Sequence, residues 1–331
     1  MQNLFELQEN KVTTNLNGYS MVIMGETGDG KTYTLDKILR SLSTDGKKPL
    51  FIMLEDRYQH IPNIMALRVH NIPELLTYVA QLKSPKAKEL YSCIVIDTAD
   101  KLDTMIEKYV AQSKEVEITG ELNFGTGNKY IKSRLFFIDE LRNDGWTVHF
   151  AMQCWKNTNI MTQKTTYDHK LNKETWAKIS HDAYLIGYIG KDQSNLKDRL
   201  LTFEKNYEMV NLKDSIGLPK TIKASEFKDV LEKSIMNIEG AVFTKEETIN
   251  TKTQEIDFEA IKTKGMELGQ LLASKGYLED AMNILKVNLG YKDEKNTQPK
   301  TFNDLLPAQA ELAQVVLLEL EKLVEKYNIP N

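Results

Sequence analysis

The chain has 331 residues, 41% of them hydrophobic and 27% charged, which is enough for one domain with an appendage or for two domains. Its formal net charge is −4: acidic residues outnumber basic ones 15 to 11 in residues 241–331 and balance them at 32 each in residues 1–240. A neutral body does not exclude nucleic-acid binding, which depends on a local basic surface.

Two cysteines, Cys93 and Cys154, have neither metal-ligand nor C-x-x-C spacing. They therefore predict reduced thiols and a cytosolic protein. The first residues lack a basic region followed by an apolar one, and no stretch approaches 18 apolar residues. We therefore expect neither secretion nor a membrane-spanning segment.

Apolar runs alternate with helical patterns along the first 240 residues. In chain order we expect a strand at 20–24, a helix to about 42, strands at 49–54 and 66–69, a helix at 73–82, a strand at 93–97, a helix at 129–143 and a strand at 147–152. Such alternation is typical of an α/β fold with a parallel sheet covered on both faces. Closely spaced strands at 184–189, 200–203 and 207–212 predict antiparallel extensions of the sheet edge.

The remainder of the chain has a different pattern. Residues 240–256 are polar, threonine-rich and aperiodic, which predicts a linker between a core at 1–239 and a region at 257–331. Apolar residues at helical spacing then predict three helices, near 258–272, 278–287 and 307–324. This all-α region is either a small bundle without chemistry of its own or a partner-binding module.

Residues 25–32 read Gly-Glu-Thr-Gly-Asp-Gly-Lys-Thr, the full G-x-x-x-x-G-K-[ST] pattern between a predicted strand and a predicted helix. Glycines let backbone N–H groups wrap a triphosphate, Lys31 can reach the β- and γ-phosphates, and Thr32 can bind Mg²⁺. We therefore expect ATP and Mg²⁺ as ligands. The expected nucleotide contacts are Gly25, Glu26, Thr27, Gly28, Asp29, Gly30, Lys31, Thr32 and Tyr33.

Carboxylates follow two other predicted strands. Asp97 ends the strand at 93–97, where it would hold Mg²⁺ together with Thr32; Asp100 is the alternative for this role, and a simple helix cap is the other interpretation of Asp97. Glu55 follows the strand at 49–54 and is our candidate for activating the attacking water. Asp56 is the alternative to Glu55, and a surface pair without a role is the third possibility.

Gln153 follows the strand at 147–152, where its amide could sense the γ-phosphate; an ordinary polar residue at the end of a strand is the alternative. Residues 154–178 then hold five lysines against two acidic residues, interleaved with aromatic side chains. Such a mobile loop suits single-stranded DNA, because cations bind phosphates and rings stack on bases; a merely solvated loop is the alternative. A glycine-rich loop at 113–128 precedes a basic helix start. The expected DNA contacts are Lys129, Lys132, Arg134, Lys156, Lys164, Tyr167, Lys170 and Lys173.

These motifs together resemble the RecA-like recombinase core, over about residues 15–235. They resemble more closely the phage RecA-like P-loop ATPases of the Sak class, which act in ATP-dependent single-strand annealing. The resemblance implies that Glu55 and Lys31 act in hydrolysis and that Gln153 couples nucleotide state to DNA-binding loops. It also implies that Lys213 reaches the γ-phosphate of a neighbouring subunit, although Ser215 stands where the recombinases have a second basic residue.

By this resemblance the protein is a homo-oligomeric phage recombination ATPase in the host-cell cytoplasm, which hydrolyses ATP, binds single-stranded DNA and promotes annealing or strand pairing. The C-terminal helices resemble partner-binding modules of phage recombination proteins, for which the expected partner is a single-stranded-DNA-binding protein. The alternatives are a phage replicative helicase or helicase loader, and a regulatory nucleotide-binding module or small-molecule kinase.

Overall fold

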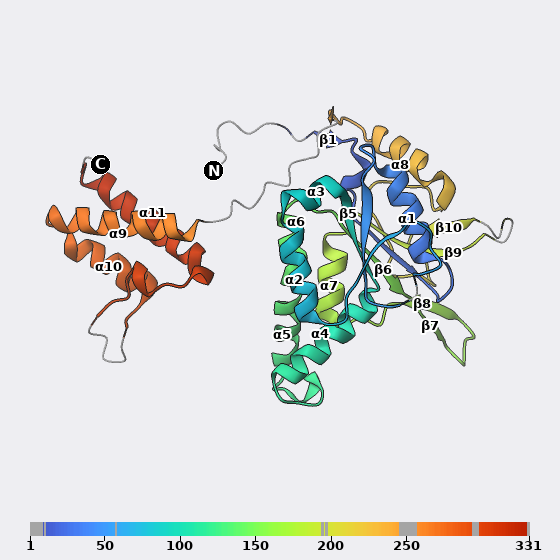
Figure 1. Cartoon of the computed structure of the whole chain (residues 1–331), viewed down its shortest axis with the longest axis horizontal. Coiled ribbons are helices and arrows are strands. Elements are labelled where there is room, and N and C mark those ends of the chain that lie inside the picture. Colours follow the sequence, from blue (N-terminus) through green and yellow to red (C-terminus); the bar gives the residue numbers. More distant parts are fainter. Residues whose placement is uncertain are drawn as a thin grey trace. The chain divides into compact units, whose positions relative to one another are not determined.

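The computed structural model describes residues 9, 11–56, 58–192, 195, 198–244, 257–292 and 298–329. The chain divides into two compact units, Met1–Lys252 and Thr253–Asn331 (Figure 1). Most of the expected linker, residues 245–256, lies outside the described residues. Its earlier part contains strand β13 (Phe243–Thr244), which pairs in parallel with β1 (Val12–Thr13); the linker itself stays a prediction.

A nine-stranded sheet forms the centre of the first unit, in the order β12-β10-β9-β2-β6-β5-β3-β4, with β11 paired to β9. The parallel strands are β2 (Met21–Gly25), β3 (Lys48–Met53), β4 (Met65–Arg68), β5 (Tyr91–Asp97), β6 (Val148–Gln153) and β9 (Leu185–Lys191). The antiparallel strands are β10 (Arg199–Thr202), β11 (Lys213–Asp214) and β12 (Thr221–Lys223). The predicted α/β class with a mainly parallel sheet is confirmed.

Helices cover both faces of this sheet. Successive strand residues point to opposite faces, so Ile52 joins one hydrophobic cluster and Phe51 the other. The first cluster packs on α2 (Ile72–Leu82), α3 (Pro85–Leu90), α4 (Ala99–Ser113), α5 (Thr126–Arg134), α6 (Phe136–Asn143) and α7 (Lys173–His181), and the second on α1 (Lys31–Leu42) and α8 (Phe227–Met236). A fully buried side chain such as Phe51 stabilises the fold by about 2 kcal/mol.

The order of the strands determines which residues meet at the carboxyl edge of the sheet. Strand β6 lies between β2 and β5. Gly25 pairs with Gln153, and Asp97 pairs with Ala151. The phosphate-binding loop, Gln153 and Asp97 therefore leave the sheet from neighbouring strands.

Several element predictions differ from the structure. The strand at 184–189 corresponds to β9, which is parallel to β2 and not an antiparallel extension. Residues 207–212 form no strand: the Asn206 side chain accepts hydrogen bonds from the backbone N–H groups of Glu208 and Met209, both at 2.8 Å, and this local turn replaces strand pairing. The helix at 129–143 is divided between α5 and α6.

The segment 154–178, which was expected to be a loop, also differs from the prediction. It contains the antiparallel hairpin of β7 (Trp155–Thr158) and β8 (Thr165–Asp168), followed by α7.

Short 3-10 turns lie elsewhere in the chain, at Leu16–Gly18, Thr119–Glu121, Ala224–Glu226, Phe302–Asp304 and Pro307–Gln309. The turn at Thr119–Glu121 falls in the glycine-rich segment expected to be a loop at 113–128.

The second unit contains the three predicted helices, α9 (Phe258–Ser274), α10 (Leu278–Leu289) and α11 (Ala310–Lys326). Phe302 is buried against Gly265, where an added Cβ would lie 2.4 Å from the Phe302 ring. The rings of Tyr277 and Tyr327 stack at 3.8 Å between centroids. Among the described residues of both units, the helices include none long and apolar enough to cross a membrane.

Candidate functional site: a phosphate-binding loop and its surroundings

The phosphate-binding loop connects the end of β2 to the start of α1. Gly30 has φ 82°, a left-handed conformation that favours glycine, and α1 begins at the next residue. At Gly25 a Cβ would lie 2.5 Å from the Ile189 side chain of β9, so close packing between the strands requires glycine there. The backbone therefore has the form that a triphosphate cradle at a helix N-terminus needs.

Side chains within the loop hold its shape. The Asp29 carboxylate accepts a hydrogen bond of 2.9 Å from the Glu26 N–H. Lys31 is 8% exposed, and its ammonium donates to the carbonyl oxygens of Gly25 and Glu26, both at 2.9 Å. Burial lowers the pKa of Lys31, and the nearby carboxylate of Asp97 opposes this shift. The lysine thus lies inside the loop, ready to exchange these carbonyls for phosphate oxygens.

The other predicted nucleotide contacts lie at the loop surface. Glu26, Thr27 and Gly28 are exposed. Tyr33 is 41% exposed, with the Lys37 ammonium 4.5 Å from its ring centroid. These residues are open to a ligand on the loop.

The two predicted metal ligands are brought together. The Thr32 hydroxyl donates to the Asp97 carboxylate at 2.5 Å, and Asp97 is 3% exposed at the end of β5. Burial raises the pKa of Asp97, while the Thr32 hydrogen bond and the charge of Lys31 lower it. Hydroxyl and carboxylate oxygens suit Mg²⁺, which is usually held by one or two protein groups, waters and substrate phosphates. This oxygen pair therefore fits an ion shared with substrate phosphates. Within the described ranges no three His, Cys, Asp or Glu residues form a metal cluster.

Asp100, the alternative metal ligand, has a different contact. Its carboxylate accepts a hydrogen bond of 2.7 Å from the backbone N–H of Gln153. Burial raises the pKa of Asp100, and the Gln153 N–H lowers it. The carboxylate therefore connects the start of α4 to the end of β6, while Asp97 takes the position beside Thr32.

Glu55 and Asp56 have different surroundings. Asp56 is exposed and forms an ion pair with Arg68 of β4. Glu55 is half-buried, and its charge contributes to the raised pKa values of both Asp97 and Asp100. Glu55, and not Asp56, thus interacts electrostatically with Asp97 and Asp100; its role in hydrolysis stays a prediction.

Gln153 lies directly beside the loop. It pairs with Gly25 across the β2–β6 ladder, and the next residue, Cys154, donates its N–H to the Gly25 carbonyl at 3.0 Å.

Burial raises the pKa of the Cys154 thiol to about 11 and that of the Cys93 thiol to about 12. Both cysteines are free thiols, and both are protonated at neutral pH.

The predicted DNA-contacting residues near the hairpin fall into two groups. Lys156 and Lys164 are exposed on the hairpin, and the Lys170 ammonium lies 4.6 Å from the Trp155 ring centroid. Tyr167 is half-buried, with its ring 5.3 Å from that of Tyr188 on β9. The surface carries cations and the exposed ring of Trp155, while the half-buried Tyr167 packs the hairpin against β9 of the sheet.

The remaining predicted DNA contacts lie on α5 and at the start of α7. Lys129, Lys132 and Lys173 are exposed. Asn172 donates to the Asn128 side chain at 3.5 Å, which brings the starts of α7 and α5 together. Arg134 is half-buried and lies over the Tyr109 ring at 5.1 Å. Figure 1 shows α5 and the hairpin at the same end of the sheet.

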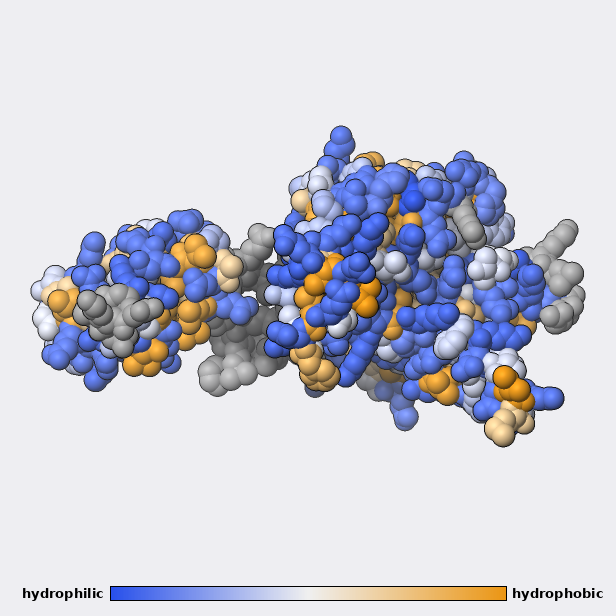
Figure 2. All heavy atoms as spheres, turned by 90° about the horizontal axis from the view of Figure 1, so that it is seen from below, coloured by the Kyte–Doolittle hydropathy of each residue, from blue (hydrophilic) through white to orange (hydrophobic). Residues whose placement is uncertain are grey.

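Two other residues of the 154–178 segment make contacts within the first unit. Trp176 stacks on His169 at 4.1 Å, and Lys178 forms an ion pair with Asp139. Figure 2, a view onto this end of the first unit, shows a mainly hydrophilic surface with separate hydrophobic areas. Trp176 and Lys178 are therefore engaged in contacts within the first unit. Fewer basic and aromatic side chains of this segment are exposed than the sequence indicated.

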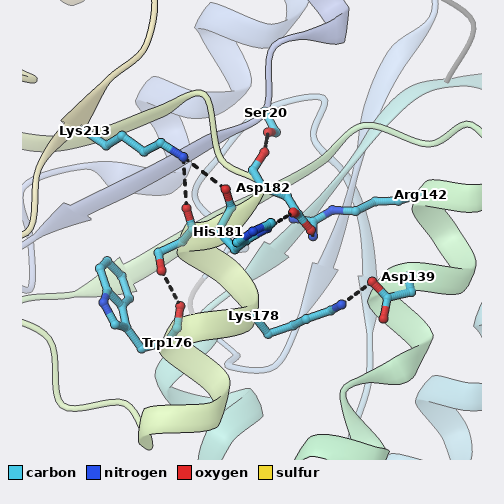
Figure 3. A network of polar contacts seen from close by, with 9 residues as sticks. Ser20, Asp139, Arg142, Trp176, Lys178, His181, Asp182 and Lys213 are labelled. Atoms are coloured by element: carbon cyan, nitrogen blue, oxygen red, sulfur yellow. Dashed lines mark hydrogen bonds and ion pairs between the residues drawn. The ribbon is translucent and has the colours of Figure 1, made fainter.

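Lys213 is not close to the phosphate-binding loop of its own chain. It pairs with Ile186, at the amino end of β9, whereas the loop leaves the carboxyl end of β2. Its ammonium donates to the carbonyl oxygens of Ser180 and His181 at 3.3 and 3.0 Å (Figure 3). A cation at the negative end of α7 is a stabilising arrangement. The proposed action of Lys213 on a neighbouring subunit stays a prediction.

Arg199, which the sequence did not single out, does contact the loop. It begins β10, and its Nε donates to the Asp29 carbonyl at 2.7 Å. A single arginine at the start of an expected strand is part of no motif, so the sequence gives no signal for this contact. Its contact depends on the pairing of β10 with β9 and of β9 with β2.

Comparisons with known proteins agree with this geometry. A family described as an AAA domain matches residues 17–213, which include the phosphate-binding loop, Glu55, Asp97 and Gln153. The chain is also similar to an SPbeta prophage-derived uncharacterized protein, YorG, of Bacillus subtilis (strain 168). The two are 24% identical over 313 residues, which cover 87% of this chain and 90% of that protein. With its phosphate-binding loop on a mainly parallel sheet, the chain belongs to the AAA domain family of nucleotide-binding ATPases.

Proposed function

We propose that this chain is a phage DNA recombination ATPase with a RecA-like core, which hydrolyses ATP, binds single-stranded DNA and promotes annealing or strand pairing. The AAA domain supports the nucleotide part of this proposal. The similarity to a prophage-derived protein supports a phage origin, and with it a place in the host-cell cytoplasm.

The site supports hydrolysis by positioning and charge. Thr32 and Asp97 would hold Mg²⁺, which when bound neutralises negative charge on the phosphates. Lys31 leaves its carbonyl partners for the β- and γ-phosphates. Glu55, beside Asp97, accepts a proton from the attacking water or orients it, and this is the main task left to a side chain in phosphoryl transfer.

One observation carries the link to DNA: the hairpin begins two residues after Gln153, which itself pairs with Gly25 of the loop. The backbone N–H of Gln153 is held by Asp100 and that of Cys154 by the Gly25 carbonyl. A movement of the loop on nucleotide binding therefore acts directly on the start of the hairpin. Exposed Lys156 and Lys164, and Lys170 beside Trp155, provide the cations and the ring that single-stranded DNA requires.

The binding test uses fluorescence anisotropy of a labelled single-stranded oligonucleotide with Mg-ATP, without nucleotide, and over a range of salt concentrations. We expect tighter binding with Mg-ATP and a linear fall of log affinity with log salt. Lys31→Ala should lose the nucleotide effect. Binding that is absent, or that does not respond to salt, would refute the DNA part of the proposal.

The competing function, a helicase or helicase loader, predicts unwinding of duplex DNA or tight association with a helicase. Unwinding measured on a forked duplex under the same conditions separates the two. We expect annealing of complementary strands without unwinding.

The second unit is proposed to bind a partner, a single-stranded-DNA-binding protein, and the first unit to form homo-oligomers. Hydrophobic side chains are exposed on the second unit, where Leu278, Val287 and Leu306 are 53%, 76% and 66% exposed, and Figure 2 shows hydrophobic areas on it. Its sequence is acidic overall, which suits a protein contact better than a DNA contact.

A further inference from the structure

Arg199 contacts the phosphate-binding loop from the strand beside it. Its Nε donates to the Asp29 carbonyl at 2.7 Å. Its guanidinium also lies against Gly30, where an added Cβ would be 3.4 Å from Nε and 3.7 Å from Nη2. The arginine therefore touches the two residues that immediately precede Lys31.

The guanidinium is itself held in place. Its Nη1 donates to the Asp198 carbonyl at 2.9 Å, and the Asp198 carboxylate accepts hydrogen bonds from the Arg199 N–H at 2.8 Å and from the Ser225 hydroxyl at 2.6 Å. These contacts connect the start of β10 to the 3-10 turn at Ala224–Glu226. The loop thus rests against a preformed support.

We propose that Arg199 is a positioning residue for the nucleotide. It fixes the peptide between Asp29 and Gly30, so that the N–H groups of the loop converge on the β- and γ-phosphates before ATP arrives. Ordering a loop on binding costs affinity, and a loop that is already ordered avoids that cost. The guanidinium also adds a permanent positive charge beside the loop. The inference rests on the proposed binding of ATP.

The test measures the Kd for Mg-ATP and the kinetics of hydrolysis in the full chain, for the wild type, Arg199→Ala and Arg199→Lys. We expect Arg199→Ala to raise Kd and KM about tenfold, because a loop without this support loses conformational freedom when ATP binds, and to change kcat less than about threefold. Arg199→Lys should recover part of the affinity, because an ammonium can also donate to the Asp29 carbonyl.

Lys205→Ala is the matched control, since Lys205 is an exposed cation three residues after the end of β10. It should leave Kd unchanged. The nucleotide-free Arg199→Ala protein should stay folded, with a melting temperature lowered by only a few degrees, because the lost hydrogen bonds lie within the first unit. The inference is wrong if Arg199→Ala binds Mg-ATP within about twofold of the wild type, or if kcat alone falls. A wild type that binds no ATP would instead refute the proposed function.

Discussion

At the scale of single residues, the site is a set of short contacts around Asp97. Thr32 donates to it at 2.5 Å, while Lys31 and Glu55 both influence its pKa. A buried carboxylate that interacts with a hydroxyl and a lysine fits a site that binds phosphates together with Mg²⁺. The proposed role of Glu55, as the group that acts on water, can be tested directly by mutation.

Replacing Glu55 by Gln should lower kcat for ATP hydrolysis at least about 100-fold, because the amide cannot take the proton of the attacking water. The Kd for ATP should stay within about threefold of the wild type. Asp56→Asn is the control, since Asp56 pairs with Arg68; it should keep most of the turnover. The assignment moves to Asp56 if the two results are exchanged.

His149 makes the stability of the fold depend on pH. Its Nδ1 accepts a hydrogen bond of 3.1 Å from the Met21 N–H, so the ring is neutral. Burial lowers the pKa of His149 to about 3, and the charge of Arg142 adds to this shift. In the unfolded chain the pKa is about 6.5. Below that pH the unfolded chain takes up a proton that the folded protein does not bind.

The free energy of unfolding should therefore fall by about 1.4 kcal/mol per pH unit as the pH drops from about 6 to about 4 on account of this group. His149→Asn keeps an acceptor for Met21 without titrating, so its denaturation curves should lose this part of the slope. Exposed His60→Asn should keep it. Equal slopes in all three proteins would show that His149 does not set the pH dependence.

The residues of the phosphate-binding loop were predictable, because its conformation is encoded within eight consecutive positions. Asp97 and Gln153 were predictable because each ends an apolar strand. Arg199 was not, since its contact with Asp29 arises from the pairing of strands far apart in sequence. The same reason explains Lys213, whose position follows from the register of β11 on β9.

At the scale of elements, the hairpin β7–β8 is the part that the proposed function depends on most. Replacing Lys156 and Lys164 by Ala should weaken binding of single-stranded DNA and reduce the slope of log affinity against log salt by about 0.7 per lost phosphate contact. ATP hydrolysis without DNA should not change. The measurement is anisotropy at several salt concentrations.

Lys83→Ala with Lys86→Ala is the matched control. Both lysines are exposed, and they lie just before β5, at the amino edge of the sheet. This pair should leave the salt slope unchanged. If both double variants reduce the slope equally, the effect comes from total charge and the hairpin is not the DNA-binding surface.

Element predictions succeeded where one pattern dominates the local sequence. The parallel strands were found as continuous apolar runs. Helix α4 was missed although Leu102, Ile106 and Val110 form a buried stripe at intervals of four residues, which a search for helical spacing could have found. The prediction of a strand at 207–212 was wrong, because two of the apolar residues on which it rested, Tyr207 and Val210, are exposed. Composition alone cannot show which residues become buried.

At the scale of the whole molecule, the two compact units have separate cores. We expect two transitions in calorimetry, of which Mg-ATP raises only the one belonging to the first unit. Phe302→Ala, which empties the space against Gly265, should destabilise only the second unit, by about 3–5 kcal/mol. A single transition that responds to both changes would mean that the units unfold together.

In the proposed function, nucleotide hydrolysis in the first unit is coupled to binding of single-stranded DNA through Gln153 and the hairpin. The most direct measurement is the rate of ATP hydrolysis by the full chain at saturating Mg-ATP, with and without a single-stranded oligonucleotide. We expect stimulation by DNA that is lost in Lys156→Ala with Lys164→Ala. An equal rate with and without DNA, at a DNA concentration that saturates binding, would contradict it.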